Sequence, residues 1–266
     1  MGLFNKNKKE EYVPKTGILG NADDYSVYEM KPVEKILYFV LAAVVGAVVG
    51  NIFYENMILS GIAALICGFV FVPVRKKQII AKRQQKLLLQ FKDMLDSLST
   101  SIGAGSNVHD AFASAAHDME MQYTADSDIY RELKIILAGM ANNINIEELL
   151  LDFGDRSQQP DIISFANVFD TCYRKGGNIR DVLKNTYRIL CDKIDISLEI
   201  KTMVSSKTSE QNIMLVMPVI FVYLLKQMGS DVINLTSSTG RTSTTIAVLM
   251  FAAAYWLSKK ILNIKI

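Results

Sequence analysis

The chain has 266 residues, of which 50% are hydrophobic, and its 29 Lys+Arg against 27 Asp+Glu leave a net charge of +2. A mean hydropathy of +0.20 is above the value typical of a soluble domain, which predicts segments apolar enough to enter a membrane. Cys67, Cys172 and Cys191 form no CxxC pair, so neither a disulfide framework nor a zinc site is indicated, and we expect all three to be packing residues.

Uncharged apolar runs lie in two pairs towards the two ends of the chain. They cover residues 36–54, 57–74, 212–225 and 243–258. At about 1.5 Å per helical residue, each run of the first pair can cross roughly 30 Å of hydrocarbon. We predict four transmembrane helices, as one pair at 36–74 and a second at 212–262, with a short tail at 263–266. The charged segment 1–35 is not typical of a cleaved signal, so the first span should be retained.

Positive charge after the second run predicts the orientation. Six basic residues lie within 75–90, and no acid occurs before Asp93: Arg75, Lys76, Lys77, Lys82, Arg83 and Lys86. By the positive-inside rule this flank is cytoplasmic, which also places both termini and the region 75–211 in the cytoplasm. We expect the first five of these side chains to meet anionic lipid headgroups, at about 1 kcal/mol for each.

The apolar runs contain residues suited to helix packing and lack residues suited to transport. Ala42, Gly46 and Gly50 recur every four residues and form a ridge that another helix can approach closely, in the same chain or in a second one. Pro218 lies within the third run and should kink its helix. The runs contain no ionisable group of the kind that marks an intramembrane enzyme or an ion pathway.

Between the two pairs lies an acidic region with helical periodicity. Residues 91–211 contain 12 Lys+Arg and 19 Asp+Glu, and this net charge of −7 argues against nucleic acid as a partner. Apolar residues such as Phe91, Leu95 and Leu98 recur every three or four positions, and no alternating stretch indicates a strand. We predict a compact bundle of about six helices within 75–211, whose last helix continues towards the third run.

Two glycine turns separate helices of this bundle. Gly103 and Gly105 end its first helix, and Gly176 and Gly177 end its fifth, because glycine accepts the left-handed conformation of a helix C-terminus. The turns lie about 73 residues apart, so a duplicated three-helix unit stays open. They are also candidate contacts for partner proteins.

The candidate chemical motifs of the chain have simpler structural explanations. His109 and His117 are eight residues apart rather than the four of a zinc-binding pair, and the segment Asp126–Asp128 lacks the glycine and glutamate of a calcium loop. Four acids between positions 147 and 155 lie where carboxylates favour the N-terminal dipole of a helix. We therefore expect no catalytic residue, no cofactor and no metal. The four acids are Glu147, Glu148, Asp152 and Asp155.

Two glycine-containing segments in this order resemble the type II secretion system F domain family. The first, FKDMLDSLSTSIGAGS at 91–106, follows a basic flank, and the second, YRKGGNIRDVL at 173–183, precedes the run with Pro218. The resemblance covers residues 36–262. One domain with two predicted spans on each side is most similar to the TadB type of the tight-adherence pilus machinery, whereas general secretion and classical pilus members carry two such domains.

This resemblance implies a non-enzymatic platform protein of the inner membrane. Such proteins couple a cytoplasmic hexameric ATPase to the extraction of pilin subunits and to filament assembly. The implied partners are the ATPase, pilin subunits, membrane lipids, and a second platform protein or another copy of the chain. The residues alone leave two alternatives open. A transporter or channel subunit would need polar, pore-lining spans, and a membrane-anchored sensor would need ligand or phosphorylation chemistry in its helical module.

Overall fold

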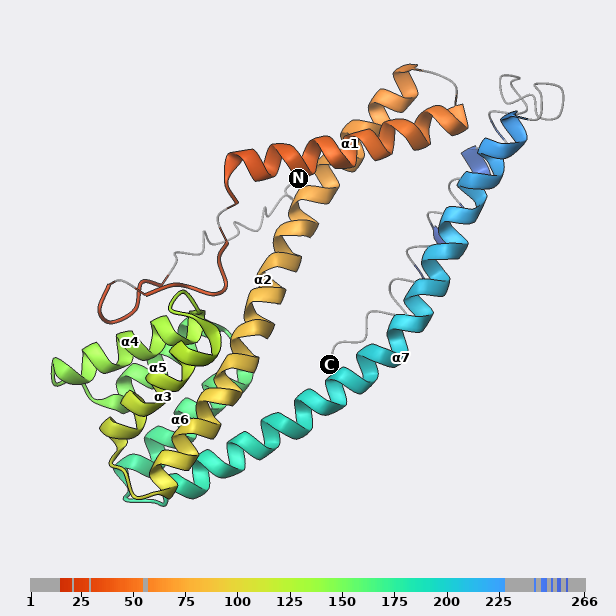
Figure 1. Cartoon of the computed structure of the whole chain (residues 1–266). Coiled ribbons are helices and arrows are strands. Elements are labelled where there is room, and N and C mark those ends of the chain that lie inside the picture. Colours follow the sequence, from red (N-terminus) through yellow and green to blue (C-terminus); the bar gives the residue numbers. More distant parts are fainter. Residues whose placement is uncertain are drawn as a thin grey trace, which may run out of the picture. The chain divides into compact units, whose positions relative to one another are not determined.

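The computed structural model describes residues 15–20, 22–28, 30–54, 57–227, 242, 245–247, 250, 253–254 and 257, and every regular element in this part of the chain is an α-helix (Figure 1). The prediction of an all-α protein is therefore confirmed. The helices in chain order are α1 (Pro32–Tyr54), α2 (Met57–Gly103), α3 (Val108–Tyr123), α4 (Asp128–Ala141), α5 (Ile146–Ser157), α6 (Pro160–Arg174) and α7 (Ile179–Gln227).

The chain divides into two compact units, and each is built from two separate stretches of sequence. One unit, here called the bundle, contains the residues up to Tyr28 together with Ile79–Cys191. The other, here called the apolar unit, contains Glu29–Gln78 and the residues from Asp192 onward. The boundary between the units falls inside α2 and inside α7, so the chain passes from one unit to the other within two helices.

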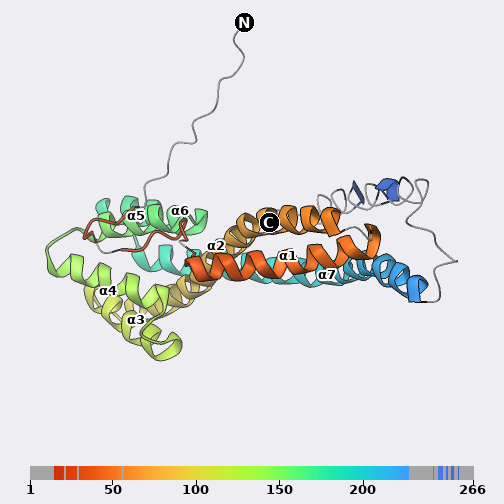
Figure 2. The same ribbon diagram turned by 90° about the horizontal axis from the view of Figure 1, so that it is seen from above.

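Aromatic and aliphatic side chains from every helix of the bundle form its core. The predicted face of α2 is the one that is buried, since Phe91, Leu95 and Leu98 are fully inaccessible. The Phe91 ring lies 6.1 Å from the ring of Phe153 in α5 and 5.4 Å from the ring of Phe165 in α6. Figures 1 and 2 show α3 to α6 gathered beside the C-terminal half of α2. Burial of one such phenylalanine is worth about 3–5 kcal/mol, judged by its replacement with alanine.

Local chemistry sets the ends of the bundle helices. The Asn107 side chain accepts a hydrogen bond of 2.8 Å from the Asp110 amide, which caps the first turn of α3. Pro160 begins α6, where its missing N–H costs nothing and its fixed φ suits the first helical turn. Short polar turns thus bring successive helices back beside one another.

One helical stretch among the described residues has the length and composition needed to cross a membrane. It covers Pro32–Ile52 in α1, with a mean hydropathy of 2.0. The second and third predicted spans are helical and lie within α2 and α7. The fourth, 243–258, falls largely outside the described residues. The last bundle helix does continue into the third apolar run, because α7 is a single helix from Ile179 to Gln227.

Candidate interaction surfaces

The two predicted glycine turns adopt the backbone conformations that require glycine at one position each. Gly105 has φ +96° and Gly176 has φ +69°, whereas Gly103 and Gly177 do not have positive φ. A Cβ added at Gly103, Gly105 or Gly176 would meet no atom within 4 Å. These turns therefore present open backbone to the surroundings.

A single arginine brings the two turns to the same end of the bundle. Arg180, in the first turn of α7, donates from Nη2 to the carbonyl oxygens of Ile102 at 3.2 Å and Gly103 at 3.0 Å. These carbonyls end α2 and have no partner within their own helix, so a guanidinium there also faces the negative end of the helix dipole. Residues 77 positions apart in sequence thereby form one surface.

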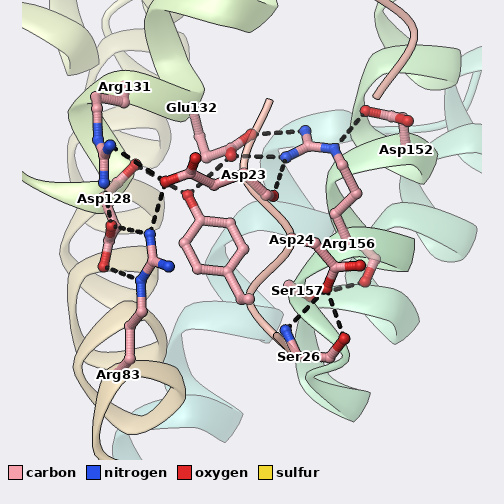
Figure 3. Close-up of polar contacts among 12 residues, drawn as sticks. Asp23, Asp24, Ser26, Arg83, Asp128, Arg131, Glu132, Asp152, Arg156 and Ser157 are labelled. Atoms are coloured by element: carbon pink, nitrogen blue, oxygen red, sulfur yellow. Dashed lines mark hydrogen bonds and ion pairs between the residues drawn. The ribbon is translucent and has the colours of Figure 1, made fainter. Parts of the chain in front are cut away.

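An N-terminal segment packs on the bundle, which the sequence did not indicate. Residues 15–28, here called the strap, form turns at Gly17 and Gly20, both with positive φ. The strap belongs to the same compact unit as α3 to α6. Its Asp24 carboxylate accepts hydrogen bonds from the Lys15 amide at 2.9 Å and from the Ser26 hydroxyl at 2.6 Å, which holds the segment in its folded form. Figure 3 shows the strap and the charged side chains that hold it.

Tyr25 anchors the strap through a buried pair of charges. Its ring is 1% exposed, its amide donates to the Arg156 carbonyl at 3.1 Å, and its hydroxyl donates to Glu132 Oε1 at 2.8 Å. Arg156 in α5 donates through Nη1 and Nη2 to the two oxygens of Glu132 in α4, both at 2.7 Å. Arg156 Nη1 also donates to the Asp23 carbonyl at 3.0 Å, and its Nε donates to Asp152 at 2.7 Å. Every charge in this buried group is thus paired.

A second charge cluster, formed by Arg83, Arg131, Asp23 and Asp128, also contacts Tyr25. Arg83 in α2 donates to Asp23 at 2.7 Å and to Asp128 at 2.8 Å. Arg131 in α4 donates to Asp128 at 2.6 Å and lies 3.1 Å from Asp23. The Arg83 guanidinium also lies 4.6 Å from the centroid of the Tyr25 ring, a cation–π distance.

Burial and charge pairing shift the pKa values in these clusters. Burial, strengthened by the negative Glu132, raises the pKa of Tyr25, so its hydroxyl stays protonated and continues to donate. Burial alone would raise the pKa of Asp128, but hydrogen bonds from Arg83 and Arg131 outweigh it and the net shift is downward. Burial alone would likewise lower the pKa of Arg156, whereas its hydrogen bonds to Glu132 and Asp152 raise it. Asp128 and Arg156 therefore stay charged at neutral pH.

The five predicted lipid contacts after Val74 lie in three different environments. Arg83 differs from our expectation, because its guanidinium is committed to Asp23 and Asp128 rather than standing free for lipid. Arg75 lies over the Tyr38 ring at 5.3 Å and donates to Gln78. The remaining three are exposed, as a lipid-facing role requires: Lys76, Lys77 and Lys82.

The predicted small-residue ridge lies where α1 meets the first part of α2. Ala42, Gly46 and Gly50 are all buried. A Cβ at Gly50 would come within 2.8 Å of the Ser60 Cα, and a Cβ at Gly46 within 3.0 Å of the Ala64 Cα. The two backbones approach as closely as glycine permits, and the partner helix is in the same chain. Pro218 lies inside α7, in the third apolar run.

Three of the four acidic residues of α5 between positions 147 and 155 lie around a shallow groove. These three, Glu148, Asp152 and Asp155, line a space of about 480 Å³ whose other walls include Ile18 of the strap and Ile163 of α6. Asp155 pairs with Lys15 at 2.8 Å and Asp152 pairs with Arg156, so two of the three carboxylates already have cations. Among the described residues, no group of three His, Cys, Asp or Glu side chains is placed to hold a metal ion.

The chain matches no protein-family model, no curated protein and no solved structure. The family resemblance therefore rests on the motifs at 91–106 and 173–183, and the function that it implies is a proposal.

Proposed function

We propose that this chain is an inner-membrane platform protein of a type II secretion or Tad-like type IV pilus machine. In this proposal it couples a cytoplasmic hexameric ATPase to pilin extraction and filament assembly, and performs no chemistry itself. It crosses the membrane four times, in two pairs of helices, with the bundle and both termini in the cytoplasm.

The observation that carries the proposal is the continuity of α2 and α7. Each helix begins or ends in the bundle and extends without interruption into an apolar run, since α2 covers Met57–Gly103 and α7 covers Ile179–Gln227. A helix transmits force and torque along its axis far better than a flexible loop does. An ATPase that displaces the bundle would therefore move the attached spans as well, which is the rigid-body kind of transition.

The surface of the apolar runs supports a membrane location. Large apolar side chains stand exposed along them, with Phe69 of α2 at 72% and Phe221 of α7 at 63%. Contiguous exposed apolar surface on this scale indicates contact with lipid or protein. The Pro32–Ile52 stretch meets the length and composition for a span by itself. The absence of ionisable groups from the apolar runs favours a platform over a transporter.

The end of the bundle that carries the glycine turns is our candidate surface for the ATPase or for a second platform subunit. Gly103, Gly105 and Gly176 have open space around them, so a partner can approach the backbone there. The net charge of −7 over residues 91–211 favours a protein partner over nucleic acid.

Copurification tests the proposal directly. The full chain should be extracted in mild detergent from cells that express it, and the bound proteins should be identified by mass spectrometry. A secretion ATPase and pilin subunits are the expected partners. A permease subunit or a kinase in their place would overturn the platform assignment in favour of a transporter or a sensor.

Cysteine labelling tests the topology independently. In a chain whose three cysteines are replaced by alanine, Thr236→Cys should react with an impermeant maleimide in intact cells. Ser106→Cys, at an exposed position of the first glycine turn, should react only after lysis. The reverse pattern would refute the cytoplasmic placement of the bundle.

A further inference from the structure

Two arginines of the bundle converge on one half-exposed carboxylate of the strap. Asp23 Oδ2 lies 2.7 Å from Arg83 Nη2 and 3.1 Å from Arg131 Nη1. The Asp23 side chain is 45% exposed, so it forms the outer layer of the cluster. Figure 3 shows the two guanidinium groups on the α2 and α4 sides of the strap.

Asp128, which is more buried than Asp23, holds the two arginine side chains in place. Its side chain is 11% exposed, and its Oδ1 accepts from Arg83 at 2.8 Å and from Arg131 at 2.6 Å. Arg83 is further positioned over the Tyr25 ring. Both guanidinium groups are therefore oriented by groups other than Asp23, and such preorganisation lowers the entropic cost of binding an anion.

The charges of this cluster balance only while Asp23 is present. Arg83 and Arg131 carry two positive charges, and Asp128 carries one negative charge, so the cluster without Asp23 has a net charge of +1. Two planar guanidinium groups aimed at one point match the geometry of an oxyanion, and phosphate accepts such bidentate hydrogen bonds well.

We propose that Arg83 and Arg131 form a binding site for a phosphate group, and that Asp23 occupies this site as a built-in competitor. A phosphate that displaces the Asp23 carboxylate loosens the strap from the bundle. This inference depends on the geometry of the bundle alone and goes beyond the platform function.

The phosphate can come from two sources. Arg83 follows the last residue of the second apolar run by nine positions, and exposed Lys82 and Lys86 lie beside it on α2, which suits an anionic lipid headgroup. A soluble phosphate has the same chemistry and can reach the half-exposed position of Asp23.

The first test removes the competitor and measures binding of inorganic phosphate. The full chain is reconstituted in nanodiscs of neutral phosphatidylcholine and titrated with phosphate by calorimetry at constant ionic strength. Asp23→Asn leaves the Tyr25 anchor in place and should bind phosphate about tenfold more tightly than the unmodified chain, because a charged competitor is lost. Glu210→Gln removes one exposed acid from its pair with Lys207 in α7, within the apolar unit rather than the bundle, and should bind as the unmodified chain does.

A double variant tests whether the named arginines form the site. Asp23→Asn with Arg131→Gln should lose the gain in phosphate affinity. Equal affinities for Asp23→Asn and Glu210→Gln would overturn the proposal, as would an undiminished affinity in the double variant.

Two further measurements distinguish the sources and do not depend on the variants. In the unmodified chain, phosphate should accelerate hydrogen exchange at the Tyr25 amide, whereas sodium chloride of equal ionic strength should not; no difference between the two salts overturns the proposal. Nanodiscs that contain phosphatidylglycerol should show the same acceleration without added phosphate if the source is a headgroup. If only dissolved phosphate has this effect, the ligand is a soluble phosphate.

Discussion

The guanidinium of Arg156 and the carboxylate of Glu132 face each other through two parallel hydrogen bonds of 2.7 Å, although each side chain is only 1% exposed. The pair joins α5 to α4, and the Tyr25 hydroxyl completes it from the strap. A buried pair of this kind contributes little net stability relative to apolar residues of similar volume. Removal of one partner is nevertheless strongly destabilising, because the other partner stays buried without its opposite charge. The Arg156–Glu132 pair therefore restricts which segment can pack on α4 and α5 where the strap lies.

Removal of one partner should reveal this dependence. We expect Arg156→Met to lower the free energy of unfolding by about 3–5 kcal/mol, because it leaves the buried Glu132 carboxylate without its ion-pair partner. The shift in thermal unfolding of the full chain in detergent, followed by circular dichroism, measures the effect. Arg174→Met is a matched control, since Arg174 is 57% exposed and its pair with Asp170 should contribute less than about 1 kcal/mol. Equal shifts for the two variants would contradict the assignment of Arg156.

The contrast between the core and this pair shows what the sequence can predict. Phe91, Leu95 and Leu98 repeat at helical spacing, so their burial follows from the local pattern. Arg156 and Glu132 lie 24 residues apart with no pattern that links them. Only the packing of α4 against α5 brings them together.

The strap and Arg83 show a second limit. Residues 15–28 have no apolar periodicity, and their main anchor is a single aromatic ring, Tyr25, so the segment resembles a solvated terminus. Arg83 belongs to a run of basic residues, and its local composition predicts a lipid contact. Its acidic partners lie 45 and 60 positions away. The one local signal for a packed segment is the aromatic residue within Asp23-Asp24-Tyr25, after a turn with two glycines, and it was not recognised from the sequence.

The stability of the bundle should depend on pH through Asp128. Its pKa in the folded chain lies below the usual 3.8, because its hydrogen bonds from Arg83 and Arg131 outweigh the effect of burial. The unfolded chain retains the usual pKa, so the stability that Asp128 confers is present above about pH 4 and is lost as the pH falls through the lower folded value. Unfolding by urea at a series of pH values measures this loss.

Asp128→Asn isolates this contribution. The difference in stability between the unmodified chain and the variant should be largest at neutral pH and should shrink as the pH falls below the usual 3.8 and Asp128 becomes protonated. Asp155→Asn, at a residue that is 66% exposed, should differ little from the unmodified chain at any of these pH values. A difference for Asp128→Asn that stayed constant with pH would mean that its ion pairs do not set its pKa.

The close packing of α1 on α2 should tolerate no side chain at Gly50. A Cβ there would lie 2.8 Å from the Ser60 Cα, which is backbone and cannot rotate away, so the helices must separate. We expect Gly50→Ala to lower the thermal unfolding midpoint of the full chain in detergent. Gly61→Ala is the control, because a Cβ at Gly61 meets nothing within 4 Å and alanine favours the helix. Similar midpoints for the two variants would show that the ridge does not limit the approach of the helices.

The glycine turns allow structural and partner roles to be separated. Gly105→Ala and Gly176→Ala should each cost about 1 kcal/mol or more of folding stability, because alanine is strained at positive φ. Gly103→Ala should be nearly neutral, since Gly103 ends a helix with ordinary φ.

If the turns serve only as helix ends, the amount of copurified ATPase should fall in proportion to the membrane abundance of each variant. If this end of the bundle contacts the ATPase, Gly103→Ala is the decisive variant: it adds a methyl group to an open surface without backbone strain. Normal abundance of this variant with reduced ATPase binding would assign the contact to the turns. Normal abundance with normal ATPase binding in all three variants would place the contact elsewhere on the bundle.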